Sequence, residues 1–161
     1  MKIAYLRFIL WVAVILWMVL IFSLSAQPAS ESSSLSGQTI RKVAEFTIPN
    51  FNNISHEQQT SIIADLQHTA RKTAHMLIYL ALGALCTSVL SQYALKIKMR
   101  LIGAIAICAG YAITDELHQL FVKGRSAQIS DVCIDSCGAM IGIILVMLVV
   151  IIYRRHYFLE V

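Results

Sequence analysis

The stretch DELHQLFVKGRSAQISDVCID, residues 115–135, decides the fold, because it places many ionisable and amide side chains between two strongly apolar runs. Hydrophobic residues make up 58% of the 161-residue chain and charged residues only 14%. Soluble domains carry about 25% charged residues, so this composition predicts an integral membrane protein with one domain, residues 1–161. The polar side chains of the stretch include Asp115, Glu116, His118, Gln119, Lys123, Arg125, Asp131 and Asp135.

The runs around this stretch are long enough to cross a bilayer, which takes about 20 helical residues of about 1.5 Å each. Only 14 uncharged residues, 101–114, precede Asp115, so this helix must continue through Asp115 and Gln119. It therefore carries a carboxylate to the membrane boundary. We predict an all-α membrane protein, a bundle of four transmembrane helices over about residues 8–25, 73–93, 101–122 and 131–153, with a long outer loop, 26–70, between the first two.

The outer loop divides into two parts. Its polar, Ser-rich part, SESSSLSGQ at 30–38, is expected to be flexible. Ser55 and Gln58 then fit a capping box, and the apolar residues that follow share one helical face. We predict a short amphipathic helix over 56–70 that runs into the second span and lies on the membrane surface or on neighbouring loops.

Positive charges near the span ends set the expected orientation. The short loop ALKIKMR, 94–100, and the YRRH segment, 153–156, favour a multi-pass cell-membrane protein with both termini in the cytoplasm. The first apolar run is longer than the core of a usual signal peptide, so we expect it to remain as a span. The sequence has no basic patch interleaved with aromatic residues, so we do not expect nucleic-acid binding. The predicted partner is the lipid bilayer.

The beginning of the last span has a polar face that continues into glycines. Asp131 and Asp135 lie one helical turn apart, and Gly138 and Gly142 extend the same face. Glycines at this spacing allow close helix contact within membranes. We therefore expect this face to turn into the bundle.

Two other spans and a turn bring polar side chains to the same membrane level. Glu116 and Asp115 lie three and four residues before Gln119 and can share a helical face. Arg125 follows on the connecting turn, and the second span adds Lys72, His75 and Tyr79 on one face. Charges within spans are candidates for a functional site. The alternative is a salt-bridge cluster that only holds the helices together, although one pair would suffice for that.

No metal motif is present in this polar set, and we predict no cofactor. Zinc-protease spacing such as H-E-x-x-H is absent from the sequence. A divalent metal stays possible, because carboxylates with one or two histidines suit an ion that bridges a phosphate. The possible ligands are His75, Asp115, Glu116, His118, Asp131 and Asp135.

Three motifs, FSLSAQP at 22–28, RKTAH with Tyr79 at 71–79, and DELHQLFVKGRSAQISDVCIDSCGAMIG at 115–142, resemble the VanZ-like family in order along nearly the whole chain. The resemblance implies a small multispan bacterial membrane protein, and the family's founding member is linked to teicoplanin resistance. Lys123 departs from the pattern, which often has proline before Gly-Arg. The polar residues that match the family are Arg71, Lys72, His75, Tyr79, Asp115, Glu116, Gln119, Arg125, Asp131 and Asp135.

Two functions fit the polar set, and the sequence leaves open whether the protein is an enzyme. In the first, an outer cleft binds an envelope lipid headgroup or lipid-linked precursor, or alters access to it; an effect on teicoplanin susceptibility is what the family resemblance implies for such a cleft. Arg125 and Lys72 would pair with its phosphate or carboxylate. In the second, a membrane-embedded hydrolase or transferase acts on a lipid phosphate or lipid-linked saccharide. Its acid or base would be Glu116 or Asp115, with His75 as a further candidate.

Two other functions are less favoured. A proton- or ion-coupled carrier needs a continuous polar path, whereas these polar residues stop near the outer boundary. A structural partner subunit would need only the salt-bridge cluster. Binding and cleavage of a phosphate use the same residue types, so the sequence does not separate the first two functions.

Overall fold

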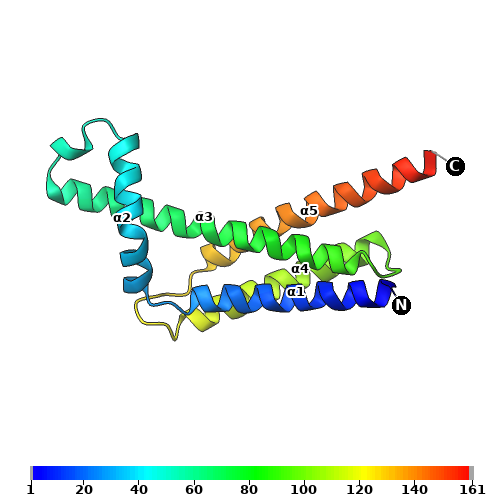
Figure 1. Cartoon of the computed structure of the whole chain (residues 1–161). Helices are drawn as coiled ribbons and strands as arrows, with labels where there is room; N and C mark the ends of the chain where they lie inside the picture. Colours follow the sequence, from blue (N-terminus) through cyan, green and yellow to red (C-terminus); the bar gives the residue numbers. More distant parts are fainter. Residues whose placement is uncertain (1, 160–161) are drawn as a thin grey trace.

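The chain is all-helical in a computed structural model, which describes residues 2–159, without the side chains of 30–33, 35 and 154–159. No strand occurs in this range (Figure 1). Four helices are long and apolar enough to cross a membrane, which confirms the predicted fold class. The elements are α1 (Lys2–Ser25), α2 (Ala29–Thr47), the 3-10 turn η1 (Phe51–Asn53), α3 (His56–Leu90), α4 (Ile97–Gln119) and α5 (Ile129–Leu159).

The helix α3 is the centre of the bundle and contacts α1, α4 and α5, with its most extensive contact to α5. Tyr79, Leu82, Cys86 and Val89 of α3 are fully buried, at the spacing of one helical face. Many large apolar side chains of α1 and α5 are exposed, as expected for surfaces that lipid covers. In Figure 1 the start of α1 and the end of α5 lie at the same end of the bundle, and α5 diverges from the other spans.

Glycines bring α3 and α5 together at the backbone. A Cβ atom on Gly138 would collide with the carbonyl oxygen of Met76, and one on Gly142 with that of Leu80. Gly83 of α3 makes the reciprocal approach to the carbonyl of Ala139. The prediction that the glycine face turns into the bundle is confirmed, because any side chain at these positions would push the helices apart.

The expectation of a flexible Ser-rich segment was wrong, because residues 30–38 form part of α2. Figure 1 shows α2 crossing the end of the bundle at a steep angle to α3. Ala44 is fully buried, and Arg41 joins α2 to α3 through an Nη2 to Gln59 Oε1 hydrogen bond of 3.2 Å. Packing against α3 thus stabilises a helix that serine-rich composition disfavours.

The predicted surface helix and the second span form one continuous helix, α3, of 35 residues. The capping box is present: the Ser55 side chain accepts from the Gln58 backbone N–H at 3.3 Å, and Gln58 Oε1 accepts from the Ser55 N–H at 3.3 Å. At about 1.5 Å per residue α3 is about 52 Å long. It therefore extends well beyond a hydrocarbon core of about 30 Å.

The other span boundaries differ from the prediction by a few residues. The helix of the fourth span, α5, begins at Ile129, two residues earlier than predicted. The helix of the third span, α4, ends at Gln119, three residues before the predicted 122. The chain then turns, with Val122 N–H donating to the Gln119 carbonyl at 3.1 Å. The acidic and amide groups of α4 therefore occupy its last turns, directly beside the loop to α5.

Candidate functional site

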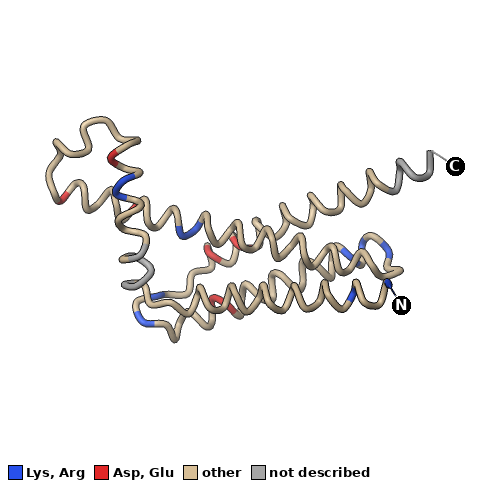
Figure 2. The backbone as a smooth tube through the Cα atoms, in the orientation of Figure 1, with Lys and Arg blue, Asp and Glu red and all other residues tan. Residues whose placement is uncertain are grey.

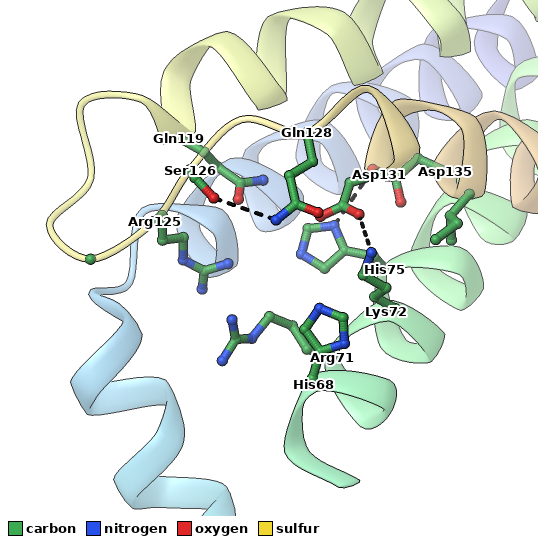
Figure 3. A pocket seen from close by; sticks show the side chains of 12 residues that line it. His68, Arg71, Lys72, His75, Gln119, Arg125, Ser126, Gln128, Asp131 and Asp135 are labelled. Atoms are coloured by element: carbon green, nitrogen blue, oxygen red, sulfur yellow. Dashed lines mark hydrogen bonds and ion pairs between the residues drawn. The ribbon is translucent and has the colours of Figure 1, made fainter. Parts of the chain in front are cut away.

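A polar pocket of about 80 Å³ lies between α3, the α4–α5 loop and the start of α5. Figure 3 shows basic side chains of α3 and the loop around its opening, with acidic side chains of α5 behind them. Hereafter "polar pocket" means the space lined by His68, Arg71, Lys72, His75, Gln119, Gly124, Arg125, Ser126, Gln128, Asp131, Ile134 and Asp135.

Two pairs of opposite charge connect α3 and α5 along one wall. Lys72 Nζ lies 2.7 Å from Asp131 Oδ1, and both side chains are a quarter exposed. One turn deeper, His75 Nδ1 lies 3.5 Å from Asp135 Oδ2. The Asp135 side chain is fully buried, and its oxygens accept no hydrogen bond from the described residues. Polar and charged side chains therefore extend from the rim of the pocket into the bundle.

The carboxylate of Asp115 lies at the same depth, on α4. Ser25 Oγ of α1 donates to Asp115 Oδ2 at 2.9 Å, while Asp115 Oδ1 has no partner among the described residues. Gln119 Nε2 lies 3.5 Å from Asp115 Oδ2, but is closer to Glu116 Oε1, at 3.0 Å. Asp115 is thus held by α1 through one oxygen, while its other oxygen is buried without a hydrogen bond from the described residues.

Glu116 is buried but does not line the polar pocket. Its Oε1 accepts from Gln119, and its Oε2 accepts from the backbone N–H of Gln128 at 2.9 Å. It borders a separate apolar hollow with Leu117 and Val132. In this geometry Glu116 connects α4 to the loop before α5.

The Arg125 side chain is fixed over the pocket by the backbone. Gly124 has φ of 77°, a left-handed conformation that favours glycine, and Arg125 Nε donates to the Gln27 carbonyl at 3.0 Å. Burial, and then the positive charge of Arg71, lower the pKa of Arg125. Within the described part of the chain, neither Arg71 nor Arg125 forms an ion pair with a carboxylate.

A second, mainly apolar pocket of about 320 Å³ adjoins the first. Hereafter "apolar pocket" means the space between α1, α2 and α3. The two pockets share Arg71, His75 and Arg125, so the basic residues stand at the junction of a polar space and an apolar one. The apolar pocket is lined by Leu24, Gln27, Ser36, Ile40, Gln67, Ala70, Arg71, Ala74, His75, Ile78 and Arg125.

Most of the ten polar residues that match the family meet here, with two exceptions, and His118, a possible metal ligand from sequence, lies instead against the Phe22 ring, with ring centroids 4.1 Å apart. Seven of the ten line the polar pocket: Arg71, Lys72, His75, Gln119, Arg125, Asp131 and Asp135. Asp115 lies just behind His75 and Asp135. Glu116 faces away, and Tyr79 is fully buried behind the pocket with its ring 6.3 Å from that of Tyr111.

Sequence reasoning missed four polar residues of this region. His68 lies four residues before Lys72, so helical spacing could have revealed it. Ser126 and Gln128 line the pocket from an irregular loop, whose path has no periodic signal. Ser25 reaches Asp115 across 90 positions of sequence, a contact that only the packed bundle defines.

Comparison with known proteins identifies the family of the chain. The family model described as VanZ/LLP1 matches residues 10–151, which is most of the chain and includes every residue that lines the polar pocket. No curated protein and no solved structure matches. On the extent of the family match, and in agreement with the motifs at 22–28, 71–79 and 115–142, the chain belongs to the VanZ/LLP1 family.

Proposed function

We propose that this membrane protein binds the anionic headgroup of an envelope lipid, or of a lipid-linked precursor, in its polar pocket. The position of Arg71 and Arg125 supports this most directly: both line the polar and the apolar pocket, and neither pairs with a carboxylate of the described chain. Two guanidiniums beside each other favour an anion between them, because charge-assisted bonds to phosphate offset their repulsion.

The two adjoining pockets suit an amphiphile. A phosphate would pair with Arg71 and Arg125, while part of the lipid tail would occupy the apolar pocket beside Leu24 and Ile78. Lys72 is already paired with Asp131, so it would contribute at the rim as a second contact. A soluble anion would use only the polar half of this arrangement.

We place this end of the bundle at the extracytoplasmic surface. Figure 2 shows basic residues, without acidic ones, at the end where the chain starts. These include Arg7, Lys96, Lys98 and Arg100. Positive charges near span ends favour the cytoplasmic side, so the termini would be cytoplasmic and the polar pocket would face the envelope.

The test is to purify the protein from native membranes and to identify bound lipid by mass spectrometry. We expect a phosphate-bearing lipid in the wild type. In Arg71→Gln and Arg125→Gln, each of which removes a charge-assisted hydrogen bond worth about 1.5–3 kcal/mol, we expect about 10- to 100-fold weaker binding.

Arg41→Gln is the matched control, since Arg41 is an exposed arginine of α2 that pairs with Glu45 at 3.2 Å. It should retain the lipid. Equal lipid content in all four proteins would contradict the proposal. A change of teicoplanin susceptibility in cells that carry Arg71→Gln but not Arg41→Gln would extend it to the phenotype that the family name implies.

A second candidate, hydrolysis or transfer at the lipid phosphate, draws on one further observation. His75 and Asp135 line the polar pocket, and Asp115 stands behind them, so an acid or base would lie next to a bound phosphate. Glu116 faces elsewhere and its oxygens are occupied, which leaves Asp115 as the better of the two carboxylates first considered. A dephosphorylated or transferred product in the bound fraction would favour this function over binding alone.

A further inference from the structure

Three side chains of metal-ligand type meet at the buried side of the polar pocket. His75 of α3, Asp115 of α4 and Asp135 of α5 each place one ligand atom so that the three atoms lie within 4.8 Å of one another. Asp115 and Asp135 are 2% and 0% exposed. Three different spans supply the three groups, so the cluster exists only in the assembled bundle.

The two carboxylates in this cluster have few partners: Asp135 forms an ion pair with His75 at 3.5 Å, and Asp115 accepts a hydrogen bond from Ser25. The other Asp115 oxygen and both Asp135 oxygens accept no hydrogen bond from the described residues. Tyr79 lies one turn along α3 from His75. Its hydroxyl is also buried and has no hydrogen-bond partner among the described residues. Burying carboxylates in this way is costly unless another charge compensates them.

Among the described bases, only His75 forms an ion pair with either carboxylate. Lys72 pairs with Asp131 at 2.7 Å, and the Nε of Arg125 donates to a backbone carbonyl. A protonated His75 would bring one positive charge against the two negative charges of Asp115 and Asp135. A divalent cation bound by a neutral imidazole and both carboxylates would balance them completely.

We propose that His75, Asp115 and Asp135 bind one divalent cation of the Mn²⁺ or Zn²⁺ class. One nitrogen and two oxygen ligands suit metals that accept imidazole as well as carboxylate. Ligands on opposite sides of such an ion are about 4 Å apart, at about 2.0–2.2 Å each. A small inward movement of the 4.8 Å cluster is therefore enough to close the site.

The proposed ion would have open coordination positions toward the polar pocket, because His75 and Asp135 line that pocket. A phosphate there would complete the coordination, and the ion would stabilise its negative charge. Cation binding itself rests on the cluster alone and does not depend on the lipid. Failure of one proposal is therefore distinguishable from failure of the other by measuring metal and lipid separately.

The experiment uses the full-length protein in detergent, stripped with a chelator and then dialysed against Mn²⁺ or Zn²⁺, with metal per chain measured by mass spectrometry. The wild type should hold a single ion per chain. Asp135→Asn and His75→Gln should bind at least about tenfold more weakly, because loss of even an outer-shell partner weakens metal sites by about 10- to 100-fold. Asp65→Asn is the matched control, since Asp65 is an exposed aspartate of α3 outside the cluster, and it should retain the ion.

A spectroscopic measurement on the wild type covers the case in which a variant does not fold. Mn²⁺ bound at this site should show magnetic coupling to a single imidazole nitrogen, and it should raise the melting temperature of the stripped protein. A wild type without stoichiometric metal, or with Mn²⁺ that lacks the nitrogen coupling, would overturn the proposal. Equal metal binding by wild type and folded Asp135→Asn would also overturn it, and protons would then be what neutralises the carboxylates.

Discussion

Gly142 and Gly110 stand on neighbouring spans, α5 and α4, in very different surroundings. A Cβ atom on Gly142 would collide with the carbonyl oxygen of Leu80, whereas a Cβ atom on Gly110 would meet nothing within 4 Å. The first glycine is thus part of the contact between α3 and α5, and the second is an exposed helical position. The same substitution at both separates packing from helix propensity.

Gly142→Ala should lower the thermal stability of the protein in detergent, because overpacking a tight contact costs about 1–3 kcal/mol. Gly110→Ala should leave it unchanged or raise it, since alanine favours a helix by about 1 kcal/mol over glycine. Unfolding followed by intrinsic tryptophan fluorescence measures both. Similar shifts in the two variants would mean that the backbone contact is unimportant.

Glu116 has a structural role in this geometry, and truncation should expose it. Glu116→Ala would remove the closer of the two acceptors of the buried Gln119 amide and the side-chain acceptor of the Gln128 backbone N–H. Each unsatisfied group costs about 1–3 kcal/mol, so the melting temperature should fall and the α4–α5 loop should become more sensitive to protease. Glu57→Ala, at an exposed position, should change little. An unaltered Glu116→Ala protein would argue against this connection.

The sequence was enough to identify most polar residues of the site, but it did not show in which direction each side chain points. Helical spacing placed His75, Asp131 and Asp135 at one level, and the structure brings them to one pocket. The same spacing allowed Glu116 to share that level, yet its side chain lies outside the polar pocket and bonds to Gln119 and Gln128. The direction of this side chain is set by the packing of α4 against its neighbours, which no local pattern encodes.

At the scale of whole elements, α2 and α3 differ in how well the sequence predicts them. The start of α3 was predictable, because a capping box acts through residues only three apart. The helicity of α2 was not, because its contact with α3 joins segments such as Arg41 and Gln59 that are distant in sequence. Local signals identify helices that stabilise themselves and miss those that neighbours stabilise.

Ser55→Ala should weaken the first turn of α3 by about 1 kcal/mol, because it removes the acceptor for an otherwise unpaired N–H. We expect faster amide hydrogen exchange at the start of α3, around residues 56–60, with the transmembrane part unaffected. Ser61→Ala, an exposed serine inside the same helix, should not accelerate exchange. Uniform exchange in wild type and Ser55→Ala would mean that the cap is not formed in solution.

At the scale of the whole molecule, the four spans leave two ends with different charge. One end holds the start of α1 and the short α3–α4 connection, and the other holds α2 and η1 (Figures 1 and 2). The polar pocket lies toward the second end, because the α4–α5 loop and the start of α5 line it. The lengths of the apolar runs were enough to predict the number of spans, since a bilayer imposes a minimum length on each.

Single cysteines at the two ends test the orientation. In a background without the four native cysteines, two of which are exposed, Asn52→Cys should react with a membrane-impermeant thiol reagent added to intact cells. Lys98→Cys should react only after the membrane is opened. Both positions are exposed, so access to the reagent depends on the side of the membrane. The reverse pattern would move the polar pocket to the cytoplasmic face.

The backbone contact between α3 and α5 has a thermodynamic consequence for any ligand of the pocket. Two pairs of opposite charge join α3 to α5 at the pocket, Lys72 with Asp131 and His75 with Asp135. Just below these pairs, Gly138 and Gly142 hold the same two helices in contact. The conformational entropy of bringing these groups together is therefore lost once, during folding, and not again at each binding event. A ligand meets a surface that is already ordered, and more of its contact energy appears as affinity.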